Sequence, residues 1–530
     1  MVNNIFNSEN LQTLVTKVEE AARSSEEGVK HFIEPAQGTL RRAVNRRHHI
    51  VFGRRGSGKS SLLRKAAADL TTDRRPIAYV NLEAFKGHSY PDVLLSVLIS
   101  TFREFKQWIE TAAVNPAHKT SFWQRLFGTK PMRPAFNRKR SALLAEKLES
   151  QIEALESQLH AAEEAQLKIT TSTREETKGE RQLSAGAKAS GAGVLLGTST
   201  TSAKNRRHEA EEQYRRKKID FLHRHIMDYQ QLFREMAALS SGDAYLFLDD
   251  LYHIRRADQP QVIDYFHRIA KDHSLWLKIG TIRHRTDWYF HGDPPIGIKL
   301  GDDADQIDLD ITLEKYSVAK EFLLRILTNF ATECSIAVED LMTDGAVDRL
   351  VLASGGVARD FLSVFRMSVD VARERTETSA ESGDKINVED VNKAAGEYDG
   401  PKREEFKRDT LEDDQDLDEE FQTIRNFCLD RANSNCFLLG KDAKGNEVAL
   451  IHELVDLKLL HLVRSRVTVS GRRGKIFEAY MLDLSQYAGA RKRRGLEMIE
   501  FWKPGAQEGL RKASLIYDVK PKVAQRQPTD

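Results

Sequence analysis

Short apolar runs alternate with amphipathic segments through the first half of the chain. Runs that favour β-strands occupy residues 50–52, 76–82, 244–248 and 275–280, and residues 61–68 favour a helix directly after a glycine-rich turn. Strand-sized runs separated by helical segments are typical of a parallel sheet with helices packed on it. The pattern therefore predicts an α/β domain.

A long helical insertion separates the second of these runs from the third. About 160 residues follow Glu83 before the third run begins, far more than a plain crossover connection needs. Within them apolar residues keep a heptad track, with Gln166 as its polar interruption: Leu148, Ile152, Leu155, Leu159, Ala162 and Ile169. Residues 206–238 fit a return helix, and small residues at 184–197 fit the tip. We expect residues 115–235 to form a projecting antiparallel coiled-coil hairpin, with a passive spacer as the alternative.

The C-terminal part of the chain has a different pattern. Residues 421–431 and 446–457 fit helices, and the apolar runs 459–464 and 475–482 fit strands that pair across a glycine-containing turn. Helices followed by a glycine-tipped β-hairpin predict a winged helix. Its turn carries Arg472 and Arg473, which suit phosphate contacts, whereas a protein-contacting winged helix is the alternative.

The glycine-rich turn matches the complete P-loop pattern G-x-x-x-x-G-K-[ST], with a strand before it and a helix after it. Its residues, the predicted nucleotide-binding set, are Gly53, Arg54, Arg55, Gly56, Ser57, Gly58, Lys59, Ser60 and the following Ser61. Backbone N–H groups of such a loop surround phosphate oxygens at the positive end of a helix. Lys59 is then expected to reach the β- and γ-phosphates of ATP, and the Ser60 hydroxyl to ligate Mg²⁺.

Two carboxylates end the third apolar run, as in the Walker B motif of P-loop enzymes. Asp249 and Asp250 are adjacent, so strand alternation sends their side chains in opposite directions. We assign Asp249 to the metal and Asp250 to the attacking water as general base. The alternative for a terminal Asp-Asp pair is helix capping, which accounts for neither the apolar strand nor the upstream loop.

The fourth apolar run ends in polar residues. Thr281 stands at the strand tip, where a hydroxyl is placed to sense the γ-phosphate. Arg283 and Arg285 follow it and are candidates for arginine fingers that reach the nucleotide of a neighbouring subunit. Solvated loop charges are the alternative for both arginines.

Residues 353–362 and 386–395 carry a family resemblance. The first stretch resembles the sensor 2 helix of initiator-type AAA+ ATPases, and the second resembles the helix that closes their lid. The chain is most similar to origin-recognition ATPases, with STAND ATPases next. The resemblance implies that Arg359 contacts the γ-phosphate from the lid. Asp250 departs from the family, in which glutamate is more usual.

Together these features predict an ordered series of domains. A P-loop ATPase core with a parallel sheet is followed by a helical lid and a C-terminal winged helix, and the core carries the inserted hairpin. The predicted boundaries are 1–29 for an N-terminal helical segment, 30–310 for the core, 311–400 for the lid, 401–420 for a charged linker, and 421–530 for the winged helix and a basic tail.

Charge is informative by position and not by its total. There are 81 Lys and Arg against 79 Asp and Glu, a net of +2. Residues 111–145 nevertheless hold no acidic residue, and include aromatic residues together with Arg138, Lys139 and Arg140. Basic residues neutralise phosphates and aromatic rings stack on bases, so this segment is a candidate for nucleic-acid binding. A solvated helical face is the alternative.

Few other features bear on the compartment. The three cysteines have no metal-ligand spacing, no apolar run approaches a membrane span, and the N-terminus does not fit a signal peptide. We therefore expect a cytoplasmic protein without a membrane partner.

The function expected from the sequence is an ATP-driven switch of the AAA+ or STAND type. It would act on nucleic acid, in a DNA transaction or in anti-phage defence, as an ATP-favoured homo-oligomer with an unidentified protein effector. The rival interpretation is a non-catalytic scaffold that holds ATP and recruits proteins through the hairpin and the winged helix.

Overall fold

The fold centres on a five-stranded parallel sheet of order β2-β3-β4-β1-β7. This is a computed structural model, which describes residues 5–21, 32–72, 75–114, 136–184, 212–240, 242–378, 383–409, 414–489 and 495–519. The strands are β1 (His49–Phe52), β2 (Ile77–Asn81), β3 (Ala244–Asp249), β4 (Leu275–Thr281) and β7 (Asp305–Asp308). All four strand pairings are parallel, with Val51 opposite Gly280 and Asn81 opposite Asp249. The prediction of a P-loop α/β core is confirmed.

Helices cover both faces of this sheet, which explains why β1 and β3 are buried along their whole length. Helix α3 (Lys59–Thr72) packs Leu62 and Leu63 against one face, on Val51 and Phe247. Helices α4 (Asp92–Val114) and α9 (Gln259–Ala270) cover the other face. Alternate residues of each strand therefore enter two separate apolar clusters.

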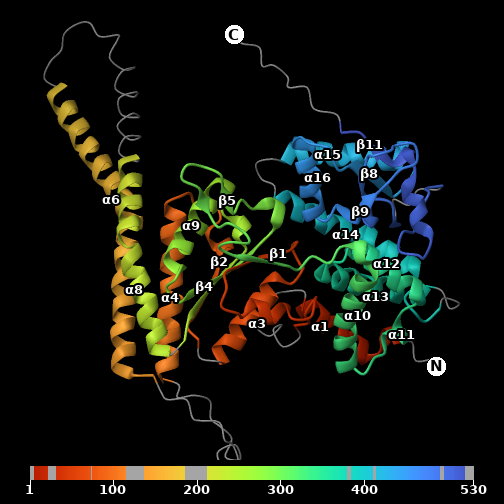
Figure 1. The fold of residues 1–530 in the computed structure, drawn as a ribbon, viewed down its shortest axis with the longest axis horizontal. Helices are drawn as coiled ribbons and strands as arrows, with labels where there is room; N and C mark the ends of the chain where they lie inside the picture. Colours follow the sequence, from red (N-terminus) through yellow and green to blue (C-terminus); the bar gives the residue numbers. More distant parts are fainter. Residues whose placement is uncertain are drawn as a thin grey trace, which may run out of the picture.

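The inserted helices form the antiparallel pair that the sequence predicts, and their described part packs against the core. Helix α6 (Arg138–Ser184) lies along α4, and α8 (Ile226–Ser240) runs beside them (Figure 1). Leu148, Ile152 and Leu155 are buried in the cluster that also holds Phe102 and Phe105 of α4. The first turns of the heptad track therefore pack on α4 of the core. The tip at 185–197 lies outside the described residues.

The lid consists of α10 (Tyr316–Glu333), α11 (Val338–Leu341), α12 (Asp344–Ser354), α13 (Ala358–Thr378) and α14 (Val388–Asp409). The N-terminal helix α1 (Glu9–Ala21) packs on it through Leu11, Leu14 and Val18. Residues 401–409 continue α14, and α15 begins at Asp414, so most of the predicted charged linker is helical. Lys402, placed in that linker by its charge, is buried.

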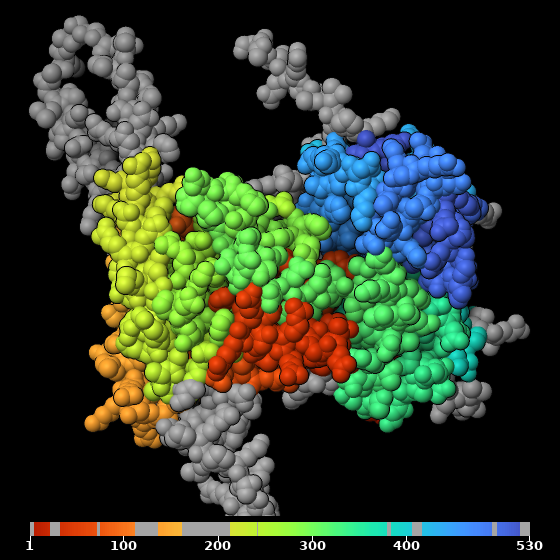
Figure 2. All heavy atoms as spheres, viewed as in Figure 1, coloured from red at the N-terminus to blue at the C-terminus, as the bar shows by residue number. Residues whose placement is uncertain are grey.

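The C-terminal part contains the predicted helices and hairpin together with two unexpected strands. Helices α15 (Asp414–Asn426) and α16 (Asn446–Asp456) pack on a sheet of order β11-β8-β10-β9. Its strands are β8 (Cys436–Gly440), β9 (Leu460–Val467), β10 (Phe477–Leu482) and β11 (Ile516–Tyr517). The lid and this C-terminal sheet share one continuous apolar cluster, and they lie together on one side of the molecule (Figure 2). None of the described helices combines the length and apolar character that a bilayer crossing requires.

Candidate nucleotide-binding site

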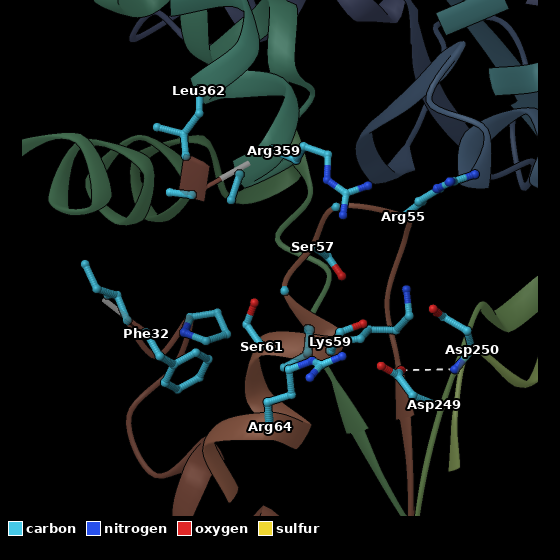
Figure 3. A pocket seen from close by; sticks show the side chains of 18 of the residues that line it. Phe32, Arg55, Ser57, Lys59, Ser61, Arg64, Asp249, Asp250, Arg359 and Leu362 are labelled. Carbon is cyan, nitrogen blue, oxygen red and sulfur yellow. Dashed lines mark hydrogen bonds between the residues drawn. The ribbon is translucent and has the colours of Figure 1, made fainter. Parts of the chain in front are cut away.

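A pocket of about 280 Å³ opens where the carboxyl ends of β1 and β3 meet the lid. One end of it is polar and is lined by the loop 55–61, by Asp249 and Asp250, and by Arg359 from the lid (Figure 3). The other end is apolar, and its lining comes from the N-terminal segment and lid helices: Phe32, Ile33, Pro35, Phe322, Ile326, Phe330 and Leu362. A charged end joined to an apolar end matches the two halves of a nucleotide, its phosphates and its base.

The glycine-rich loop has the geometry of an anion cradle. Gly56 and Gly58 have φ values of 87° and 95°, which a side chain would strain. Lys59 is buried, and its Nζ donates to the carbonyl oxygens of Gly53 at 2.9 Å and Arg54 at 3.2 Å. Burial lowers the pKa of Lys59, against the opposing effect of the nearby carboxylates. The buried Ser57 Oγ has no hydrogen-bond partner among the described residues, so the loop fits an added polyanion.

The two carboxylates that end β3 have different surroundings. Asp249 accepts hydrogen bonds on both oxygens, from the Asp250 backbone N–H at 3.0 Å and from the Tyr79 hydroxyl at 2.5 Å. Asp250 adopts a left-handed conformation, with φ 59° and ψ 46°. Burial and the neighbouring Asp249 raise the pKa of Asp250 to about 6, although Lys59 opposes the rise. The pair thus separates into an oriented carboxylate and one whose proton affinity lies near neutral pH.

The lid reaches the loop through Arg359. Its backbone N–H donates to the Gly56 carbonyl oxygen at 3.3 Å, and its side chain lines the pocket above Ser57 (Figure 3). A Cβ atom at Gly56 would lie only 2.8 Å from the Arg359 Cβ. Glycine at this position therefore allows the lid to approach the loop closely.

Other predicted site residues do not line this pocket. The buried Thr281 hydroxyl lies 2.5 Å from Thr286 Oγ1, so it is used within its own loop and does not reach the pocket. Arg283 pairs with Asp308 at 3.1 Å and lies 4.0 Å from the centre of the Phe52 ring. The Arg285 guanidinium lies 5.4 Å from the centre of the Tyr252 ring. The arginine-finger role, which requires a neighbouring subunit, stays a prediction.

Arg54 is turned away from the pocket, unlike the other arginine of the loop. Its guanidinium is buried and donates to Asp310 at 3.2 Å, and to the carbonyl oxygens of Ile311 at 3.3 Å and Gly355 at 3.0 Å. Gly53 also lies outside the lining, whereas Arg55 and the rest of the predicted set belong to it. Arg54 therefore contacts the lid and does not line the pocket, so the candidates for direct nucleotide contact are residues 55–61.

Several pocket residues were absent from the sequence-based set. Asn81 ends β2 and Glu83 comes just after it, beside the carboxyl end of β3, and His253 follows Asp250 closely. Ligand atoms of Glu83, Asp250 and His253 lie within 4.8 Å of one another. Polar residues at the ends of adjacent parallel strands converge, so the positions of these residues at strand ends could have indicated them. The sequence did not indicate which strands are adjacent.

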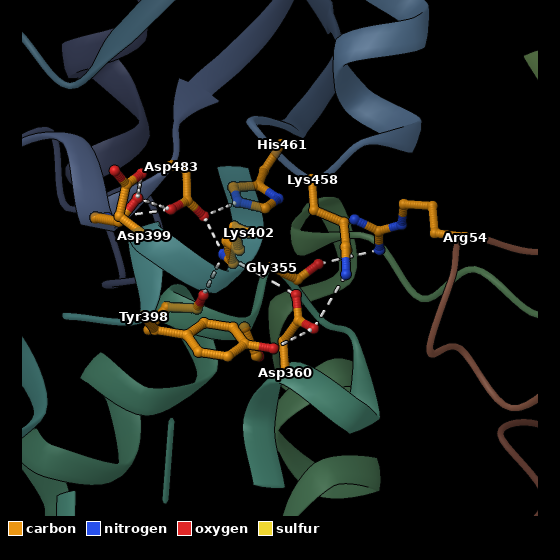
Figure 4. Close-up of polar contacts among 12 residues, drawn as sticks. Arg54, Gly355, Asp360, Tyr398, Asp399, Lys402, Lys458, His461 and Asp483 are labelled. Atoms are coloured by element: carbon orange, nitrogen blue, oxygen red, sulfur yellow. Dashed lines mark hydrogen bonds and ion pairs between the residues drawn. The ribbon is translucent and has the colours of Figure 1, made fainter. Parts of the chain in front are cut away.

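Buried charges join the lid to the C-terminal part (Figure 4). Lys458 Nζ lies 3.1 Å from Asp360 Oδ1, and Lys402 Nζ lies 2.8 Å from Asp483 Oδ2 and 4.0 Å from Asp360 Oδ2. His461 Nε2 lies 2.8 Å from the same oxygen of Asp483. These side chains are at most 4% exposed, so each charge depends on its partner.

The nucleic-acid candidates fall into two separate places. Arg138, Lys139 and Arg140 are exposed at the start of α6, and Arg472 and Arg473 are exposed at the turn between β9 and β10. These elements lie on opposite sides of the molecule (Figure 1). The aromatic residues of 122–127, which the stacking argument uses, lie outside the described residues.

Comparisons with known proteins found similar solved structures only. No family model matches the chain, and neither does any curated protein. The Orc1 protein of Aeropyrum pernix, solved in complex with DNA, is 14% identical with a TM-score of 0.31, over 86% of this chain and 91% of that one. The RuvB Holliday junction branch migration motor of Thermotoga maritima is 11% identical with a TM-score of 0.30, over 87% and 91%.

Proposed function

We propose that this chain binds ATP together with Mg²⁺ and hydrolyses it, as a switch whose lid responds to the nucleotide. The observation that carries the proposal is the meeting of Lys59, Asp249, Asp250 and Arg359 in one pocket. These residues come from the P-loop, the end of a neighbouring strand and the lid, and in the sequence they are up to 300 residues apart. A phosphate-binding loop, a carboxylate pair and a cation facing them are the parts that phosphoryl transfer requires.

Each residue has a role that its position supports. The loop N–H groups and Lys59 would hold the phosphates, with Arg359 contributing a positive charge from the lid side. Ser60 and Asp249 would hold Mg²⁺, which neutralises charge that develops on the phosphate oxygens. The apolar end, with Phe32 and Leu362, would receive the base.

Asp250 is suited to accept a proton. With a pKa raised to about 6, it is mainly ionised at neutral pH yet is a stronger base than an ordinary aspartate. It would orient and deprotonate the attacking water. An aspartate reaches less far than the glutamate more usual in the family, so turnover is expected to be slow.

The direct test compares Lys59→Ala with Lys65→Ala. Lys65 lies on the same helix α3 but pairs with Asp69 at 2.9 Å, so its loss changes charge without touching the pocket. Calorimetry with ATP and Mg²⁺ should show a large loss of affinity for Lys59→Ala alone, and phosphate release should fall with it. Tight binding without phosphate release in the unaltered protein would favour the nucleotide-bound scaffold instead.

A second candidate function is DNA binding through the hairpin turn. Arg472 and Arg473 are exposed next to the exposed Lys475, and such contacts to phosphates tolerate any sequence and weaken with salt. Fluorescence polarisation at low salt should show binding that Arg472→Glu/Arg473→Glu abolishes. The variant Arg138→Ala/Lys139→Ala/Arg140→Ala tests the distant cluster separately. Unchanged polarisation with the unaltered protein, with or without ATP, would exclude this function.

A further inference from the structure

Tyr79 belongs to β2, the strand beside the one that ends in Asp249. Its hydroxyl donates a hydrogen bond to Asp249 Oδ2 at 2.5 Å. The two strands are parallel and in register, with Tyr79 opposite Phe247 and Asn81 opposite Asp249. The hydroxyl therefore spans two residues along the sheet to reach the carboxylate.

Asp249 is constrained from three directions. The Asp250 N–H holds Oδ1 at 3.0 Å, and Tyr79 holds Oδ2. On the other side, β4 presents Gly280, where an added Cβ would lie 2.7 Å from Asp249 Oδ1. The absence of a side chain at Gly280 thus leaves the space that the carboxylate occupies, and the two hydrogen bonds select one orientation within it.

The Tyr79 ring is itself held in place. The Arg64 guanidinium lies 4.8 Å from its centre, and the Phe247 ring is stacked on it with centres 6.1 Å apart. Arg64 belongs to α3, the helix that begins with Lys59, and it also lines the pocket. The hydroxyl consequently has a defined position relative to both the phosphate-binding helix and the carboxylate.

From this arrangement we infer that Tyr79 is a positioning residue, which orients Asp249 and thereby sets the affinity of the site for Mg²⁺. The inference rests on the proposed function, since it assigns a partner to the carboxylate that would hold the metal. Carboxylates that bind metals are commonly fixed by a second hydrogen bond, whose loss typically costs about 10- to 100-fold in metal affinity or activity. Tyr79 does not contact the phosphates in this assignment.

The test is Tyr79→Phe, which keeps the ring and removes only the hydroxyl. The Mg²⁺ concentration for half-maximal phosphate release should rise about 10-fold, while the rate at saturating Mg²⁺ changes little. Calorimetry should show weaker ATP binding at low Mg²⁺, and unchanged binding in EDTA. The matched control is Tyr265→Phe, which removes a hydroxyl that donates to the Leu222 carbonyl oxygen at 2.7 Å, in a buried position remote from the pocket.

The outcomes separate the inference from the function on which it rests. An unchanged Mg²⁺ requirement in Tyr79→Phe, beside normal hydrolysis by the unaltered protein, would overturn the inference alone. An equal loss of ATP affinity in EDTA would also overturn it, because the hydroxyl would then support the whole pocket. If Tyr265→Phe shifted the Mg²⁺ requirement equally, a general loss of stability would be the cause. Failure of the unaltered protein to bind ATP at any Mg²⁺ concentration would refute the proposed function itself.

Discussion

The guanidinium of Arg54 donates a hydrogen bond to the carbonyl oxygen of Gly355 at 3.0 Å, which joins the phosphate-binding loop to the turn that precedes α13 of the lid. Gly355 has φ 57°, and a Cβ atom there would lie 2.1 Å from the His461 ring of β9. Three parts of the chain, the loop, the lid and the C-terminal sheet, therefore meet at one glycine. The loop is thus connected to the C-terminal part through this glycine.

Gly355→Ala should disrupt the contact between the lid and the C-terminal sheet and destabilise the protein. The substitution forces both a strained backbone and a collision with His461, so the free energy of unfolding should fall by about 1–3 kcal/mol. Gly383→Ala is the control, because an added Cβ there meets nothing within 4 Å. Urea denaturation of both variants measures the difference. Equal stabilities would show that the contact at Gly355 is easily relaxed.

Loss of one partner from the buried pair between Lys402 and Asp483 should strongly destabilise the protein. Lys402→Met leaves Asp483 buried with only His461 and Ser485 as partners, and breaking such a pair typically costs about 3–5 kcal/mol. Lys393→Met removes the exposed partner of Glu374 instead, where solvent screens the charges and little change in stability is expected. Denaturation midpoints at constant slope report both values. A small effect of Lys402→Met would mean that water enters this interface.

Asp456 should make stability depend on pH. Burial and the nearby Asp310 raise its pKa to about 7, against the lowering effects of Arg54 and of the His284 N–H that it accepts. An acid with a raised pKa holds its proton longer in the folded state, so its contribution to stability is full below about pH 4 and is lost as pH rises through 7. Asp456→Asn should therefore flatten this decline and gain about 1–3 kcal/mol at pH 8. Thermal unfolding from pH 5 to 8 tests it.

Asp249 and Asp250 should fail in different ways. Asp249→Ala should weaken Mg²⁺-dependent binding and hydrolysis together, because this carboxylate would act through the metal. Asp250→Asn should leave ATP affinity intact and lower phosphate release by about 10²- to 10⁴-fold, the usual effect of losing a general base. Calorimetry beside single-turnover phosphate release distinguishes the two. Full turnover by Asp250→Asn would show that Asp250 is not the general base, and Glu83, which lies close to it, would be the next candidate to test.

The inserted helices should tolerate a limited deletion only. Lys218 Nζ lies 3.2 Å from the Leu159 carbonyl oxygen, so α6 and the returning helical segment are adjacent at this point. A short linker can therefore replace residues 163–211. That variant should keep ATP binding. Deleting 145–215 should instead expose the apolar face of α4, because Leu148, Ile152 and Leu155 cover it. Loss of soluble protein in the long deletion alone is the expected result.

The sequence predicted those parts of the site that are contiguous in the chain. Loop residues 55–61 and the Asp249–Asp250 pair were named from local patterns, and Arg359 from the family resemblance, and all of these line the pocket, whereas Gly53 and Arg54 do not. The contact of Tyr79 with Asp249 was missed because it depends on strand order, which a single sequence does not encode locally. Thr281 was placed at the right strand end, but its hydroxyl has a nearer partner in Thr286.

Charge patterns were the less reliable guide to the fold. The run 401–420 is rich in charged residues and was interpreted as a linker, yet its first part continues α14 and buries Lys402. The charge of Lys402 is tolerated because Asp360 and Asp483 surround it, and both come from distant parts of the sequence. A charged residue whose partner is distant in the sequence looks, from its local sequence alone, like a charged residue exposed to solvent, although the structure buries it as an ion pair.

The continuous apolar cluster of the lid and the C-terminal sheet has a mechanical consequence. Helix α1, the lid and β8 to β10 share one packed interior, whereas the parallel sheet is packed in clusters of its own. The pocket that Lys59 and Arg359 line lies between these two packed parts. A small rotation at Arg359 would therefore move the lid and the C-terminal sheet as one unit, together with the turn that carries Arg472 and Arg473.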